Sequence, residues 1–225
     1  MAMAGLRPVV AIYSTFLNRA LDQVVYDVAL HRLPVIFCLD RAGITGHEGA
    51  SPLGVYDMAL LSKVPGMRVL APSSAQELAQ MLHDASTLVD SGPIAIRYPR
   101  GAARQVSEHD VGSGLSARKV RSGSGTCIIA VGKMLETAEK AAEVLAADGV
   151  EVTVWDARCC SPLDPAMIAD AATHDRLVTI EDGIRDGGIG MAIGDAVCSL
   201  HGDTDLHVLG LPTKFFPHDP KSSTI

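Results

Sequence analysis

The chain has 225 residues, of which 48% are hydrophobic and 20% charged, as is typical of a packed globular protein. Its net charge of −7 and the lack of a dense Lys/Arg run exclude the basic surface that nucleic-acid-binding proteins usually carry. No apolar run approaches the roughly 18 residues of a membrane span, and the start, MAMAGLRPVV, lacks the pattern of a secretory signal. The sequence therefore predicts a globular protein that binds neither nucleic acid nor membranes.

The five cysteines show no metal-ligand spacing, and no CxxC motif occurs. Cys38 and Cys127 lie inside apolar runs, where a thiol behaves as a small hydrophobic group. The adjacent pair at 159–160 fits neither a zinc site nor a redox motif. We expect reduced, structural thiols, as in a cytoplasmic protein.

The first half of the chain alternates short apolar runs with helix-like segments. Residues 16–32 and 74–88 carry apolar side chains at helical spacing. The second of these begins with Ser73 or Ser74 as a candidate N-cap and Glu77 as its capping-box partner. The predicted strands, each bounded by Pro, Gly or Asp, are PVVAIYS (8–14), PVIFCLD (34–40), MRVLAP (67–72) and PIAIRYP (93–99).

A polar stretch rich in Gly, Ser and charge interrupts this rhythm at 104–124, and we interpret it as a linker with room for one edge strand. Strand alternating with helix predicts βαβ units around a parallel sheet. The sequence thus predicts an α/β protein of two doubly wound parallel-sheet domains, at residues 1–103 and 125–225. In the second domain we expect strands at 126–132, 151–157, 177–182 and 206–212 and helices at 135–149, 164–175 and 183–201.

Ligands of open parallel α/β sheets bind at the carboxyl ends of the strands. After the first strand, the stretch AIYSTFLNRALDQ (11–23) starts a helix that Ser14 or Thr15 could cap. A cap does not require the flanking Tyr13 and Phe16. In a chain with 4% aromatic residues, this pair indicates either a ring-binding surface or two aromatics packed under the helix end.

The connection DRAGITGHEGASPLG (40–54) follows a predicted strand, contains four glycines and carries Arg41 and Glu48. Connections of this length are often functional, and the alternative is a flexible surface excursion. His47, beside Glu48, forms neither a metal motif nor a catalytic triad. His174 is expected on a solvated helix face.

Three arginines, Arg19, Arg41 and Arg100, could converge on an anion, because the guanidinium fork suits phosphate oxygens. The alternative for each is an ordinary surface salt bridge. Two of the three follow predicted strands, which favours the anion site.

Glycines at 188, 190 and 194 follow a predicted strand and open a helix. Their spacing, GxGxxxG, departs from the dinucleotide-binding GxGxxG and occurs late in the chain. We therefore interpret these glycines as a close helix–strand contact, with Glu181 at the strand end.

Several stretches together carry a resemblance to a known family. They are AIYSTFLNRALDQVVYDVAL, LPVIFCLDRAGITG, VPGMRVLAPSSAQEL, GPIAIRYPRG, TIEDGIRDGGIG and LGLPTKFFPHD. These stretches resemble the 1-deoxy-D-xylulose-5-phosphate synthases, a transketolase-like family, over nearly the whole chain. The resemblance covers a pyrimidine-binding domain from its second strand onward and a transketolase-type C-terminal domain.

The resemblance implies a condensation of pyruvate with glyceraldehyde 3-phosphate that uses thiamine diphosphate and Mg²⁺ and releases CO₂, for isoprenoid and thiamine biosynthesis. It implies that Phe16 lies against the thiamine pyrimidine ring. It also implies that Tyr13, Arg41 and Arg100 hold the substrate phosphate.

Two positions depart from the family pattern. Glu48 stands where the family usually has Asp and is expected to accept a bond from a substrate hydroxyl. Pro52 stands where the family has His, and proline cannot replace an imidazole as donor, acid or base.

In the family, the cofactor-activating Glu and the Mg²⁺ and diphosphate site lie in segments before those matched here. We therefore expect no catalytic residue and no metal site in this chain. One interpretation is that the chain is part of a synthase. An N-terminal half, a partner chain or a second copy in a homodimer would then complete the enzyme. A second is a catalytically incompetent paralogue or fragment that serves as a dimerisation or interaction module. A third is a subunit of a related two-chain thiamine enzyme.

Overall fold

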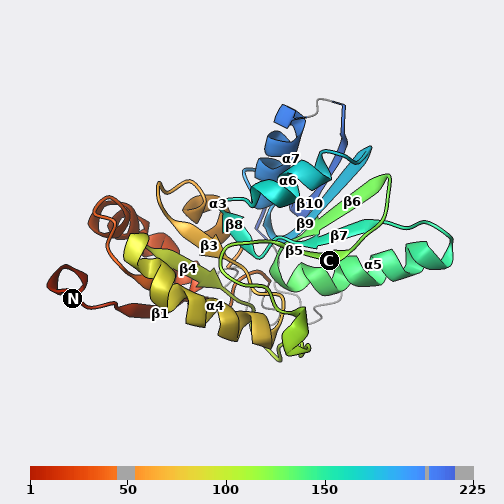
Figure 1. Cartoon of the computed structure of the whole chain (residues 1–225). Helices are drawn as coiled ribbons and strands as arrows, with labels where there is room; N and C mark the ends of the chain where they lie inside the picture. The colour runs from red at the N-terminus through yellow and green to blue at the C-terminus, as the bar shows by residue number, and fades with distance from the viewer. Residues whose placement is uncertain (45–53, 201–202, 216–225) are drawn as a thin grey trace.

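The computed structural model describes residues 1–44, 54–200 and 203–215 and folds them into two five-stranded sheets with flanking helices (Figure 1). Within these residues, no helix has the length and apolar character that crossing a membrane requires.

The first sheet contains four parallel strands from the first half of the chain. Their spatial order is β1 (Val9–Tyr13), β2 (Ile36–Asp40), β4 (Ile94–Arg97) and β3 (Arg68–Leu70). A fifth strand, β8 (Cys159–Ser161), comes from the second half and pairs antiparallel with β3. The helices of this half are α1 (Ser14–Leu17), α2 (Leu21–Gln23), α3 (Asp57–Leu61) and α4 (Ala75–Leu88), with the 3-10 turns η1 (Ala2–Ala4), η2 (Asn18–Ala20) and η4 (Val89–Ser91) and the π-helix η3 (Val24–Ala29).

The second sheet has the same plan. Its parallel strands are β10 (Asp205–Leu211), β9 (Arg176–Ile184), β6 (Thr126–Ala130) and β7 (Thr153–Asp156), and β5 (Arg118–Arg121) is its antiparallel edge. The helices are α5 (Leu135–Ala147), α6 (Pro165–Ala171) and α7 (Ile189–Leu200), with η5 (Glu108–Asp110) and η6 (Gly132–Met134).

The predicted α/β fold with two parallel sheets is confirmed, and each sheet has one antiparallel edge strand in addition. β5 lies in the segment interpreted as a linker. β8 had no predicted counterpart, and it places residues of the second half in the first sheet. The domain limits at 103 and 125 stay a prediction.

The segment predicted as one helix at 16–32 is divided. Residues 14–29 run through α1, a 3-10 turn, α2 and a π-helix, η3. Valine crowds the preceding turn of an α-helix, and three valines fall within the π-helical part. The start of α1 also differs from expectation, because no side chain caps it and the buried Ser14 hydroxyl has no hydrogen-bond partner among the described residues.

Alternation along the strands divides the core into layers. On β2, Ile36 and Cys38 pack with the helix α4, whereas Phe37 and Leu39 face the other side, toward residues 14–29. The same alternation on β6 sends Ile128 toward α5 and its neighbours toward α6 and α7. Helices therefore cover both faces of each sheet, which explains strands that are apolar throughout.

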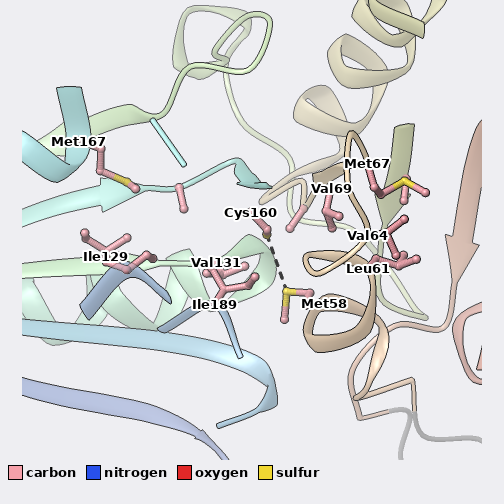
Figure 2. Packing of buried hydrophobic residues seen from close by; sticks show 14 of the residues in the cluster. Met58, Leu61, Val64, Met67, Val69, Ile129, Val131, Cys160, Met167 and Ile189 are labelled. Atoms are coloured by element: carbon pink, nitrogen blue, oxygen red, sulfur yellow. Dashed lines mark hydrogen bonds between the residues drawn. The ribbon is translucent and has the colours of Figure 1, made fainter. Parts of the chain in front are cut away.

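One hydrophobic cluster runs across both halves of the chain (Figure 2). Met58 and Val69 lie on the side of the first sheet, and Ile129 and Ile189 lie on the other. Cys160 of β8 lies between these groups, with its sulfur 3.8 Å from that of Met58. Both thiols of the 159–160 pair are thus buried, as expected of structural thiols; Cys160 lies at the junction between the halves, and Cys159 packs with α4.

The chain passes from one sheet to the other within two residues. The amide of Ala157 donates to Ala130 in the second sheet, at 2.9 Å, and the carbonyl of Arg158 accepts from Ala71 in the first, at 2.8 Å. Arg158 has φ 52° and is fully buried. The backbone crossing therefore places one long cationic side chain inside the junction.

Arg158 is neutralised by α4. Its Nε donates to Glu77 at 2.8 Å, and both side chains are 0% exposed. Glu77 had been predicted to complete a capping box. The Ser74 hydroxyl does accept from the Glu77 amide, at 3.1 Å, but the Glu77 carboxylate binds Arg158 and the amide of Gly112 instead.

The substitution Arg158→Met should lower the free energy of unfolding by about 3–5 kcal/mol, because it leaves the buried Glu77 carboxylate with only Arg118, 4.0 Å away, as a counter-charge. Arg7→Met, which breaks a two-bond pair with Asp90 between half-exposed side chains, is the matched control and should lose less than about 1 kcal/mol. Urea unfolding measures both. Equal losses in the two variants would contradict the role assigned to the buried pair.

Candidate functional site

Three predicted site residues gather where the strands β1 and β2 end. The rings of Tyr13 and Phe16 are stacked, with centroids 5.7 Å apart and an interplanar angle of 24°. The guanidinium carbon of Arg41 lies 4.2 Å from the centroid of the Tyr13 ring. Phe16 is 52% exposed, so it is not packed under the helix end. The result is an open aromatic surface with a cation at its edge.

The backbone of residues 40–43 forms a tight turn that presents Arg41. The Arg41 amide donates to the Asp40 carboxylate at 2.6 Å, and Arg41 adopts the left-handed region with φ 57°. The amide of Ala42 donates to the carbonyl of Tyr98, which follows β4, at 3.0 Å. These bonds fix the direction in which the Arg41 side chain leaves the sheet.

A pair of backbone hydrogen bonds closes the connection after this turn. The amide of Gly43 donates to the carbonyl of Gly54 at 2.8 Å, and the amide of Gly54 donates to the carbonyl of Gly43 at 3.1 Å. Glu48, together with His47 and Pro52, lies outside the described residues. The predicted role of Glu48 therefore stays a prediction.

Residues of the second half contact both strands of the chain at this Gly43–Gly54 bridge. Gly43 lies so close to Asp182 that an added Cβ would overlap the carboxylate oxygen Oδ2. Next to Gly54, the carbonyl of Val55 accepts from the Ile184 amide at 3.1 Å. The position of the connection thus depends on β9 as well as on β2.

Asp182 belongs to a buried network of charges that the sequence did not reveal. Arg97, at the end of β4, donates to Asp57 at 3.1 Å and also pairs with Asp182, and all three side chains are 3% exposed or less. Lys133 lies 3.4 Å from Asp182. Burial alone would raise the pKa of Asp182, but Arg97 and Lys133 hold it below its ordinary value. Burial alone would likewise lower the pKa of Arg97, and the two carboxylates raise it instead.

Arg100 does not join the cluster of Tyr13, Phe16 and Arg41. It is exposed and lines a cavity of about 470 Å³ that the loop after β4 forms against the second half. Among the described residues, the lining includes Asp40 but none of the three cluster residues. Arg19, the third candidate for an anion site, is exposed on η2.

The glycines of α7 make close contacts, in agreement with the packing interpretation. A Cβ on Gly190 would meet Thr179 of β9, and one on Gly194 would meet Leu206 of β10. Glu181 lies under the start of this helix, where its carboxylate accepts from the Gly190 amide at 2.8 Å. Burial raises the pKa of Glu181 to about 7.

Two further expectations concern titratable groups. Within the described residues, no cluster of three or more His, Cys, Asp and Glu side chains could hold a metal ion. His174 is not solvated as predicted: it is 7% exposed, and its Nε2 lies 2.9 Å from the hydroxyl of Thr153. Its place at the end of α6 turns it toward β7.

Two family models together match almost all of the chain. The transketolase pyrimidine binding domain matches residues 1–105, and the transketolase C-terminal domain matches residues 115–223. The first match contains the cluster of Tyr13, Phe16 and Arg41, and the second contains Asp182.

Curated relatives give a finer comparison. The 1-deoxy-D-xylulose-5-phosphate synthases of Anaeromyxobacter dehalogenans and Chlorobium luteolum are 46% and 44% identical, and each match covers 97% of this chain and 35% of the relative. The chain thus spans about a third of the length of the curated relatives it matches. A solved structure, "Split gene transketolase, inactive beta4 tetramer", superposes with a TM-score of 0.84 at 25% identity, over 95% of this chain and 70% of the other.

The contact between Gly43 and Asp182 can be tested with a matched pair of glycines. Gly43 and Gly66 have φ 75° and 76°, but an added Cβ at Gly66 meets nothing within 4 Å. Gly66→Ala should lower the free energy of unfolding by about 1–2 kcal/mol, the cost of a left-handed alanine. Gly43→Ala should lose about 1–3 kcal/mol more, because it also overlaps Asp182. Equal losses in urea unfolding would show that Asp182 does not confine the turn.

The raised pKa of Glu181 predicts a pH dependence of stability. Between about pH 5 and 7 the folded chain keeps the Glu181 proton that the unfolded chain loses, so this group makes the protein less stable as pH rises. Glu181→Gln removes this titration. The free energy of unfolding of the variant should therefore rise relative to that of wild type by about 2–3 kcal/mol as the pH increases from 5 to 8. Urea unfolding at both pH values measures it. Glu151→Gln, on an exposed carboxylate, should show no such gain, and an equal response of the two variants would contradict the assignment.

Proposed function

The chain belongs to the transketolase family, and we propose that it is the pyrimidine-binding and C-terminal part of a 1-deoxy-D-xylulose-5-phosphate synthase. The observation that carries this proposal is the cluster of Tyr13, Phe16 and Arg41 at the carboxyl ends of β1 and β2. It combines a flat aromatic surface with a cation. Relatives 40–46% identical to this chain, all named 1-deoxy-D-xylulose-5-phosphate synthase, support the choice within the family.

The proposed reaction condenses pyruvate with glyceraldehyde 3-phosphate and releases CO₂. Thiamine diphosphate, when bound, supplies the carbanion chemistry, while the protein supplies orientation and charge. In this chain, Phe16 offers its exposed ring to the pyrimidine of the cofactor. Tyr13, Arg41 and Arg100 are the candidate contacts of the substrate phosphate, Tyr13 and Arg41 at the aromatic cluster and Arg100 in the neighbouring cavity.

The residues present fit the pyrimidine end of the cofactor. Phe16 is half exposed, and its stacking on Tyr13 holds the ring in one orientation. Stacking of a base on an aromatic side chain contributes about 1–3 kcal/mol. Our proposal assigns no residue of this chain to Mg²⁺. It assigns the substrate hydroxyl contact to Glu48, on the resemblance alone.

A split enzyme is the second candidate, in which this chain is one of two subunits. The observation that favours it is the similarity to a split-gene transketolase that is described as an inactive β4 tetramer. Under either proposal the partner is an N-terminal half or a further copy of the chain. Five unpaired thiols support a reducing, cytoplasmic location.

A chimera tests the proposed function. In it, this chain replaces the matching third of the Thermobifida fusca relative, which is 42% identical over 228 residues. The chimera should form 1-deoxy-D-xylulose 5-phosphate. Phe16→Ala should weaken thiamine diphosphate binding roughly tenfold, because stacking is lost. Arg100→Ala should raise KM for glyceraldehyde 3-phosphate about tenfold and leave KM for pyruvate unchanged.

Arg121→Ala, on the edge strand of the second sheet, is the control and should change neither constant. A folded chimera that binds thiamine diphosphate but forms no product would favour an incompetent interaction module. A chimera that is active but indifferent to Phe16→Ala would remove the assigned role of the aromatic surface.

A further inference from the structure

The cavity lined by Arg100 lies at the junction of the two halves. Arg100 and Arg104 come from the loop after β4, whereas Lys133 comes from the turn before α5. Its volume of about 470 Å³ is within the range of small-molecule sites. Figure 1 shows the start of α5 beside the start of α4. The two halves therefore build one concave site together.

The cationic groups of this cavity keep donors for a ligand. Lys133 is 34% exposed and lies 3.4 Å from Asp182, and an ammonium group has three donors. Arg104 pairs with Glu139, and a guanidinium group has five donors. One existing ion pair thus leaves each of these two side chains able to donate further bonds.

The carboxylates of the lining already accept hydrogen bonds. Asp40 accepts from the Arg41 amide at 2.6 Å, and Glu136 accepts from Lys140 at 2.6 Å. Three cationic side chains therefore face two acidic ones whose charges are partly engaged elsewhere. This balance favours an anion over a cation.

The start of α4 also borders the cavity, but its first amides are engaged. The amide of Ala75 donates to the carbonyl of Arg104 at 2.9 Å, and that of Glu77 donates to the Ser74 hydroxyl at 3.1 Å. The donors that remain for an anion are therefore mainly the cationic side chains.

We propose that this cavity binds the phosphate of a small organic phosphate, and that Lys133 of the C-terminal half is a phosphate ligand beside Arg100. The choice of a triose phosphate as ligand rests on the proposed function, whereas the site itself rests on the cavity and its charges. A compact ammonium suits a single phosphate group. The C-terminal half then contributes directly to substrate binding.

Titration of the chain with glycerol 3-phosphate, which resembles the substrate but cannot react, tests the inference by NMR. Inorganic phosphate is the second probe, and glycerol is the neutral control. Glycerol 3-phosphate should bind with a millimolar or lower Kd that rises with added salt. Lys133→Met should raise the Kd about tenfold, the equivalent of one charge-assisted hydrogen bond. Lys133→Arg, which keeps the charge, should stay within about threefold of wild type.

Lys119→Met is the matched control, because Lys119, on the edge strand of the second sheet, has the same 34% exposure and pairs with Asp170. It should bind as wild type does. Arg100→Gln provides a second variant at an exposed position, and it should also raise the Kd about tenfold. Undiminished binding in Arg100→Gln would overturn the inference even if Lys133→Met failed to fold.

The outcomes separate this inference from the proposed function. Loss of binding in Arg41→Ala, but not in Lys133→Met, would place the phosphate at the aromatic cluster and overturn the inference, while the proposed reaction stands. Phosphate binding that depends on Lys133, in a chimera without synthase activity, would support the site and remove the reaction. No binding of either phosphate probe to wild type would overturn the inference.

Discussion

Buried ion pairs that join the two halves of the chain constrain the rest of this structure. Arg97 ends a strand of the first sheet and pairs with Asp182 of the second, and Arg158 enters the junction from the second half and pairs with Glu77. Separating either arginine from its partner would leave buried charges with less of their compensation away from water. The relative position of the two sheets is thereby fixed, and with it the turn that carries Arg41.

Hydrophobic burial and charge pairing make different contributions to this junction. The cluster around Met58 and Cys160 supplies apolar contact, which holds the halves together but tolerates small shifts. A buried ion pair adds little net stability, yet it admits only one geometry. The apolar cluster therefore favours association, and the ion pairs select the arrangement in which the glycine bridge meets Asp182.

Local patterns in the sequence were sufficient to predict most strands and the longer helices, but they revealed neither the short helix α3 nor the strand β8 nor the long-range pairs. Strand runs, the Ser74 cap and the proximity of Tyr13 to Phe16 follow from neighbours a few residues apart. The three-residue strand β8 is too short to show a period, and its partner lies about 90 residues earlier. Arg97 looked like the polar end of a strand, because nothing near it in the sequence indicates Asp182. The placement of Arg41 beside Tyr13 followed the rule for parallel sheets, whereas Arg100 faces a cavity that requires the second half.

The bridge between Gly43 and Gly54 sets two fixed anchor points in the chain. Two reciprocal hydrogen bonds join the backbone at these glycines, and Asp182 and Ile184 of β9 confine their surroundings. Because loop length carries only a slowly growing entropic penalty, an insertion between the two glycines should cost less stability than a side chain added to either of them. Tolerance of length and intolerance of volume are thus expected within a few residues of each other in the sequence.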